Sequence, residues 1–335
     1  MSDRARYPLV AVRRSAWLLA LVGAAACTPP AASSAEGPAT TVSIPSAPLE
    51  TSSGPRSSRG GGLRLVYGVV QAGSAAPAAE VMRHRLARWG VDAEVKPRGD
   101  EIVVELRSPL SFEQRQSLSR PGRLEIRRCD DDRDPLAGMS PSTLPDGIAL
   151  ETENVSLGPG QYGTRHFVKV SRDPSEPPTA ARQRLEAWLH RTFPGTPMAL
   201  AGLVDTGGSI VGFRSYLLHA EVDLDNHAVA SAEPQEDRTL GGGIALPLVA
   251  VRLTDAGRDA FAQLTAAHQH RRLAILVDGL VATAPIVQST ISGGRVQISL
   301  GHGASIDDAK ALASLLADEP LPATVELQSE ELFHD

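Results

Sequence analysis

The regular pattern of apolar and polar positions begins near Leu63. From there the pattern predicts a strand, a helix closed by Gly90, two strands around a turn, a second helix and a further strand. The expected ranges are 65–70, 77–90, 91–95, 102–106, 110–118 and 124–127. This β-α-β-β-α-β order is typical of the ferredoxin-like plait.

A second group of elements follows, and we expect an inserted α+β lobe. After a loop-rich stretch, the pattern predicts strands and helices up to a last strand that returns after Pro320 and Pro322. The expected elements are a loop over 138–159, strands at 167–170, 218–224 and 248–253, a helix after Pro177, helices capped by Thr254 and by Ser305, and a strand over 323–327. The predicted fold class is α+β, with a ferredoxin-like base at 63–128, an inserted head subdomain at 129–318 and a strand at 319–330 that returns to the base.

An Asp-Gly pair marks a hairpin in this second group. Asp278 and Gly279 lie between two runs rich in β-branched residues, which is the strongest short-range signal for a β-hairpin. Gly293 and Gly294 supply a second turn, so 272–299 predicts a three-stranded meander. These four residues are interpreted as structural turns.

The same region resembles a known family. The segment 251–265, the hairpin 272–286 and the residues Ile291, Gly293, Gly294 and Ile298 are similar to the head of the large first periplasmic domain of the protein-export membrane protein SecD, of the SecDF family. The resemblance extends more thinly over Leu63 to Leu327. It implies a base-and-head fold and a non-enzymatic module that binds translocating or unfolded polypeptide, or subunits of the Sec translocon.

The chain also departs from that family. Full-length members carry transmembrane helices and use charged residues within the membrane to couple proton flow to export, and no such segment follows here. We therefore expect a stand-alone form of the periplasmic part. A structural or signalling envelope protein that kept the fold without an export role is the alternative.

The N-terminus predicts export and a lipid anchor. Basic residues precede an apolar run over 16–26, as in a signal peptide covering 1–27. The sequence Ala24-Ala25-Ala26-Cys27 resembles a lipobox, which would make Cys27 the lipidated residue; an ordinary cleavage site after Ala26 is the alternative. Residues 28–62 read as a disordered linker. The expected location is the periplasmic side of the envelope, with Thr28 favouring the outer membrane.

Composition limits the remaining classes of function. A net charge of −6 and 4% aromatic residues argue against nucleic acid as a partner. No catalytic, cofactor or metal site is predicted: the acidic run 130–134 lacks calcium-loop spacing and reads as a solvated loop, and His268 and His270 read as a helix end. Cys129 is the lone cysteine after Cys27.

Binding of a polypeptide would use strand addition or an apolar groove. The candidate contact residues are Val281, Ala284, Pro285 and Ile286, since proline near a strand end fits an edge position. The alternative is that these residues are core and edge-blocking positions.

Overall fold

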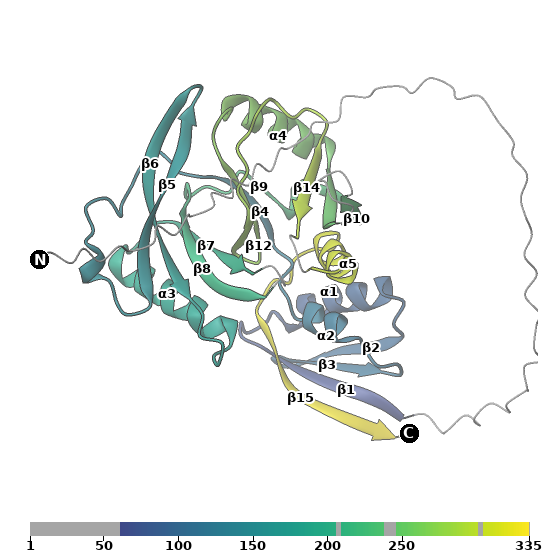
Figure 1. Ribbon diagram of the computed structural model, residues 1–335. Coiled ribbons are helices and arrows are strands. Elements are labelled where there is room, and N and C mark those ends of the chain that lie inside the picture. Colours follow the sequence, from purple (N-terminus) through teal and green to yellow (C-terminus); the bar gives the residue numbers. More distant parts are fainter. Residues whose placement is uncertain (1–60, 206–208, 238–245, 301–303, 335) are drawn as a thin grey trace, which may run out of the picture.

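The computed structural model describes residues 61–205, 209–237, 246–300 and 304–334. The predicted signal peptide, Cys27 and the linker up to residue 60 lie outside the described residues. The described part has two lobes, a base with one sheet and a head with two (Figure 1). The α+β class predicted from the sequence is confirmed.

The base is a ferredoxin-like plait. Its sheet has the order β15-β1-β3-β2 with every neighbour antiparallel, and both base helices cover one face (Figure 1). Alternate residues such as Leu65, Tyr67, Ile102 and Val104 point to that face and are almost fully buried. The elements are β1 Gly61–Val69, α1 Ala75–Arg88, β2 Ala93–Arg98, β3 Glu101–Leu106, α2 Phe112–Leu118 and β15 Val325–His334.

The strand expected to complete the plait lies elsewhere. β4 (Leu124–Arg128) falls within the range predicted for the base, but it pairs with β12 in the head, where Ile126 stands opposite Ile275. The sixth element of the plait is instead β15, which pairs with β1 along its length. Alternation of apolar residues shows which face of a strand is buried, and it does not identify the partner strand.

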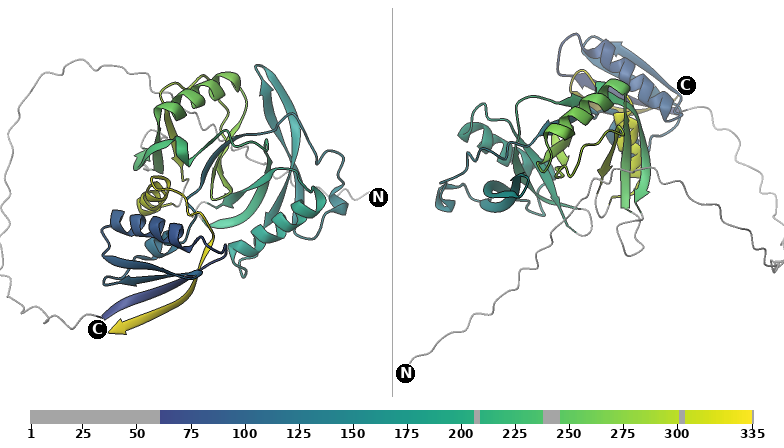
Figure 2. Two further views of the ribbon diagram at one scale, coloured as in Figure 1. Left: turned by 180° about the vertical axis from the view of Figure 1, so that it is seen from behind. Right: turned by 90° about the horizontal axis from the view of Figure 1, so that it is seen from above.

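The head contains the remaining elements, arranged as an eight-stranded sheet of order β5-β6-β8-β7-β13-β12-β4-β9 and a three-stranded sheet of order β10-β11-β14. The two views of Figure 2 show α3 and α4 on different parts of this lobe. The elements are η1 Pro141–Thr143, β5 Ile148–Gly158, β6 Gln161–Ser171, α3 Pro178–Thr192, β7 Met198–Val204, β8 Ile210–Leu217, β9 Leu224–Asp225, η2 Asn226–Ala228, β10 Val229–Asp237, β11 Leu246–Leu253, α4 Asp255–Ala267, β12 Leu273–Val277, β13 Leu280–Thr283, β14 Arg295–Ser299 and α5 Ile306–Leu316.

Three expectations for the head were wrong. The stretch read as loop contains β5. The alternating segment 218–224 is mostly irregular, because the Asp223 carboxylate accepts the backbone N–H of Arg128 at 3.0 Å and Val222 is 46% exposed. The meander stops after two strands, since β14 pairs with β11 in the other sheet.

Local signals were read correctly. Asp278 and Gly279 form the two-residue turn between β12 and β13 with φ of 51° and 77°. Thr254 caps α4 by accepting the N–H of Gly257 at 3.1 Å. Ser305 and Asp308 form a capping box at the start of α5.

Arg85 fixes the connection between base and head. Its side chain is buried in α1 and donates to the carbonyls of Ser117, Leu118, Arg120 and Pro121, where the chain leaves the base. Burial lowers the pKa of Arg85 to about 10, so the side chain stays charged at neutral pH. The returning chain is tied to the same place, because the N–H of Leu321 donates to the carbonyl of Pro121 at 2.8 Å.

Candidate functional site

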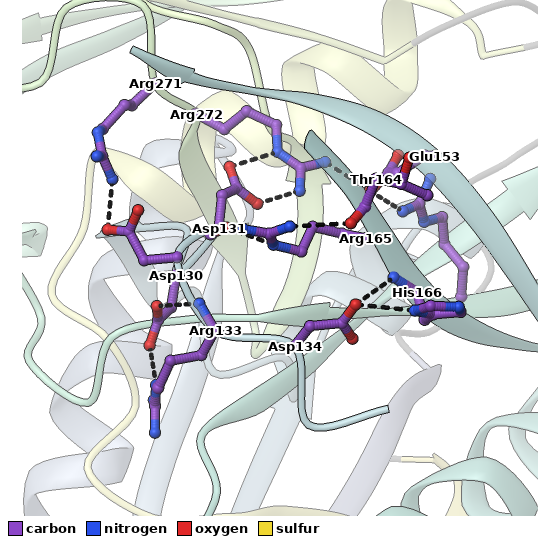
Figure 3. A network of polar contacts seen from close by, with 12 residues as sticks. Asp130, Asp131, Arg133, Asp134, Glu153, Thr164, Arg165, His166, Arg271 and Arg272 are labelled. Carbon is purple, nitrogen blue, oxygen red and sulfur yellow. Dashed lines mark hydrogen bonds and ion pairs between the residues drawn. The ribbon is translucent and has the colours of Figure 1, made fainter. Parts of the chain in front are cut away.

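Charged side chains of the head gather around the loop that follows β4, here called the acidic loop (residues 130–134). Figure 3 shows this loop between the β5–β6 hairpin and the start of β12. Asp130 and Asp131 are 5% and 4% exposed, so the expectation of a solvated loop was wrong for both. Each carboxylate is buried with an arginine partner, as a buried charge requires.

Arg272 holds the centre of this network. Its Nε donates to Asp131 Oδ2 at 3.0 Å, a second bond joins Nη2 to Asp131 Oδ1, and Nη1 donates to Glu153 Oε1 at 2.8 Å. Such a two-point contact matches the planar guanidinium to the carboxylate. Burial alone would lower the pKa of Arg272, but hydrogen bonds and charge from Asp131 outweigh it, and the pKa is raised.

Glu153 links Arg272 to a second arginine. Glu153 Oε1 also accepts a hydrogen bond from Arg214 Nη2 at 2.7 Å. Burial acts to raise the pKa of Glu153, while the bond from Arg214 and the charge of Arg272 act against it, so the pKa lies below its ordinary value. The Arg214 guanidinium carbon lies 3.8 Å from the ring centre of Phe167 and 4.4 Å from that of Tyr216.

The acidic loop also caps an unpaired part of β6. β6 pairs with β8 only at Lys169–Ser171. Beyond that point the N–H of His166 donates to Asp134 Oδ2 at 3.3 Å, and the N–H of Val168 donates to Ser215 Oγ at 3.1 Å. Side chains thus supply the acceptors that a neighbouring strand would otherwise provide.

The network has no space for a substrate. The cavity beside it measures about 30 Å³, which suits a water molecule or two. His166 Nδ1 lies 2.8 Å from Asp134 Oδ2, an arrangement that also orients the histidine of hydrolases, but among the described residues no serine hydroxyl is hydrogen-bonded to His166. Within the described ranges, no three His, Cys, Asp or Glu side chains group as metal ligands. The network, here called the clamp, therefore has a structural role: it holds the acidic loop, the β5–β6 hairpin and the start of β12 together.

Cys129 lies under this network and is 1% exposed. Burial raises the pKa of its thiol to about 12, which keeps it protonated at neutral pH. A reactive role is disfavoured because the thiolate is the nucleophilic form.

The sequence did not reveal the network. Arg272 and Asp131 are separated by 141 positions, and no local pattern pairs them. The available signal was the dense acidic run at 130–134 together with the Arg271-Arg272 pair, since opposite charges on buried elements are expected to meet.

The predicted polypeptide-contact residues lie beside the hairpin. Val281 is 5% exposed and packs in a small core with Ala199 and Leu276, so it faces inward. Ala284, Pro285 and Ile286 are half-buried, and the carbonyl of Pro285 accepts the N–H of Leu273 at 3.0 Å. β13 is a central strand between β7 and β12. Contact of these residues with a polypeptide stays a prediction.

Of the predicted turn residues, Asp278 has a further role at the connection between the lobes. Asp278 accepts hydrogen bonds from Arg120 Nε and from the backbone N–H of Arg123, both at 3.0 Å. Gly294 has a φ of 61°, and its carbonyl accepts the N–H of Leu253 at 2.8 Å. The hairpin turn is therefore attached to the chain segment that connects base and head.

Comparison with known proteins identifies relatives of both lobes. Residues 207–323 match the family described as SecDF, P1 head subdomain. The protein translocase subunit SecD of Anaeromyxobacter dehalogenans is 28% identical over 284 residues, which are 76% of this chain and 44% of that protein. SecD of Syntrophobacter fumaroxidans is 25% identical over 264 residues, 77% of this chain and 39% of that protein.

A solved structure has the same fold. The crystal structure of SecDF in its super-membrane-facing form superposes with a TM-score of 0.51 at 20% identity, over 81% of this chain and 30% of that one. The chain thus spans less than half the length of these relatives. Among the described helices, none has the length and hydropathy needed to cross a bilayer. The resemblance seen in the sequence is confirmed: residues 207–323 match the SecDF P1 head subdomain, and most of the chain is similar to SecD.

Proposed function

We propose that this chain is a non-enzymatic module of protein export that binds translocating polypeptide or partners the Sec translocon. The observation that carries the proposal is the relationship to protein translocase subunits, which covers 76% of the chain and includes base and head. The clamp around the acidic loop supports a binding role over catalysis, because its charged groups pair with one another and the cavity beside them measures only about 30 Å³.

The proposed location is the periplasmic side of the cell envelope. The basic and apolar start of the chain fits an export signal, and Cys27 would carry a lipid anchor. The segment 28–62 would then act as a tether that lets the domain stand off from the membrane.

Photo-crosslinking in cells tests the function. A photoreactive residue replaces Gln288, which is exposed beside the predicted contact residues, or Tyr162, which is 73% exposed at the tip of the β5–β6 hairpin. A probe at Lys96 on the base sheet serves as a control position. We expect adducts with nascent exported chains or Sec subunits that disappear when export is blocked. Adducts with other envelope proteins alone would favour the structural role instead.

A further inference from the structure

β15 is an open edge of the base sheet. It is ten residues long, and it pairs with β1 on one side and with no strand of the described ranges on the other. In Figure 1 it lies outermost in the base, beside β1. An unpaired edge presents a row of backbone N–H and C=O groups that can pair with another chain.

This edge borders an apolar groove. Leu332 stands opposite Leu63, and Leu327 stands opposite Tyr67, so both leucines are on the sheet face that carries the helices. They are nevertheless 79% and 49% exposed. A cavity of about 680 Å³ opens beside Leu332. Its lining includes Leu63, Leu106, Pro109, Arg115, Glu330 and Leu332.

The face of β15 that points away from the helices carries two exposed acidic residues. Glu326 and Glu331 are exposed and stand opposite Gly68 and Arg64, on the face away from the helices. On the helix face the edge carries Leu327 and Leu332 together with Glu330, whose charge is paired with Arg115. The opposite edge, β2, carries Lys96 and Pro97, residues that typically guard an edge against pairing.

We propose that an extended segment of polypeptide adds to β15 as a fifth strand of the base sheet. Its apolar side chains would enter the groove beside Leu332, and its alternate lysine or arginine side chains would face Glu326 and Glu331. Pairing with a second copy is disfavoured, because it would bring the acidic rows of two edges together. This inference rests on the proposed export function and assigns the polypeptide contact to the base.

A peptide-binding experiment tests the groove. The probe is a fluorescein-labelled ten-residue peptide of alternating valine and lysine, and fluorescence anisotropy reports its binding to the full-length protein. The double variant Leu327→Lys/Leu332→Lys should bind about tenfold more weakly. The valines of the probe would lose their apolar contact with the two leucines, and the added lysines would repel the lysines of the probe. Val222→Lys, at a head position that is 46% exposed, should bind as the unchanged protein does.

A modified probe tests the backbone pairing. The same peptide with N-methyl groups on alternate residues cannot donate along one edge, and we expect it to lose binding. Thermal unfolding of the double variant should match the unchanged protein, since both leucines are exposed. The proposal is wrong if the double variant binds the peptide as tightly as the unchanged protein does, or if the methylated peptide binds as tightly as the unmodified one. If the unchanged protein self-associates and the double leucine variant does not, the partner of β15 is a second copy of the chain, and the proposal is also wrong.

The proposed function is judged separately. Crosslinks from Gln288 to exported chains, combined with unchanged binding in the double variant, would leave the export role standing and remove only the β15 site. Absence of both crosslinks and peptide binding would remove both proposals.

Discussion

Arg272 and Asp131 are joined by two hydrogen bonds across 141 positions of the chain, one of them from Nε to Oδ2 at 3.0 Å. Their side chains are 13% and 5% exposed. The pair ties the start of β12 to the acidic loop, and Glu153 extends it to the β5–β6 hairpin. The head therefore depends on a buried charge cluster as well as on its apolar cores.

Removal of one partner of this pair should be costly. We expect Asp131→Ala to lower the free energy of unfolding by about 3–5 kcal/mol, because the Arg272 charge stays buried without its carboxylate. Urea denaturation measures the loss. The double variant Asp131→Ala/Arg272→Met should lose less than Asp131→Ala alone. Glu94→Ala, which breaks an exposed pair with Lys96, should change stability by about 0–1 kcal/mol. Equal losses in Asp131→Ala and Glu94→Ala would contradict the prediction.

Arg85 should matter for the connection between the lobes. Arg85→Met keeps the bulk of the side chain and leaves the carbonyls at 117–121 without their donor, so we expect a loss of about 2–3 kcal/mol. Hydrogen exchange should also become faster at Leu321, whose N–H bonds to this segment. Arg83→Met, on an exposed part of the same helix, is the control. A stability as high as that of the control would show that the carbonyls find other partners.

Sequence patterns predicted the features that depend on near neighbours. The turn at Asp278 and Gly279 and the caps at Thr254 and Ser305 involve residues within a few positions of each other, so their chemistry is visible locally. The closure of the base by β15 was only partly foreseen, because β4 has an equally regular pattern.

The unpredicted strands share a physical cause. β7 and β8 contain alanine, glycine and residues that are buried in no regular alternation, so no period of two was present. β5 carries the polar residues 151–154 between the buried side chains of Ile148 and Val155, and Glu153 among them meets the arginines of the clamp. The candidate clamp was missed for the same reason, since pairing of distant charges leaves no periodic trace.

Acid should weaken the clamp at Glu153. The pKa of this carboxyl is lower in the folded protein than in the unfolded chain, where it is about 4.3. Its contribution to stability is therefore fully present above the unfolded pKa and is lost as the pH falls through the folded value. We expect Glu153→Gln to be less stable than the unchanged protein at pH 7, with a difference that shrinks below about pH 5. Urea midpoints at a series of pH values measure it, and a difference independent of pH would exclude the mechanism.

The predicted anchor at Cys27 can be tested by fractionation. Cys27→Ser should move the protein from the membrane to the soluble fraction and remove labelling by a clickable fatty acid. Cys129→Ser is the matched control, because that thiol lies inside the head and should not affect the location. Membrane association that survives Cys27→Ser would reject lipidation as the anchor.

Gly257 provides a test of helix packing in the head. It lies in the first turn of α4, where a Cβ would stand 2.7 Å from the carbonyl oxygen of Ala228 and 2.9 Å from its Cβ. Alanine favours a helix over glycine by about 1 kcal/mol, but overpacking against backbone costs about 1–3 kcal/mol. We therefore expect Gly257→Ala to be destabilised in urea. In Gly293→Ala the added Cβ has no atom within 4 Å, so we expect the free energy of unfolding to be unchanged or slightly higher. If Gly257→Ala were the more stable of the two, helix propensity would outweigh the contact, and α4 would not be held against Ala228.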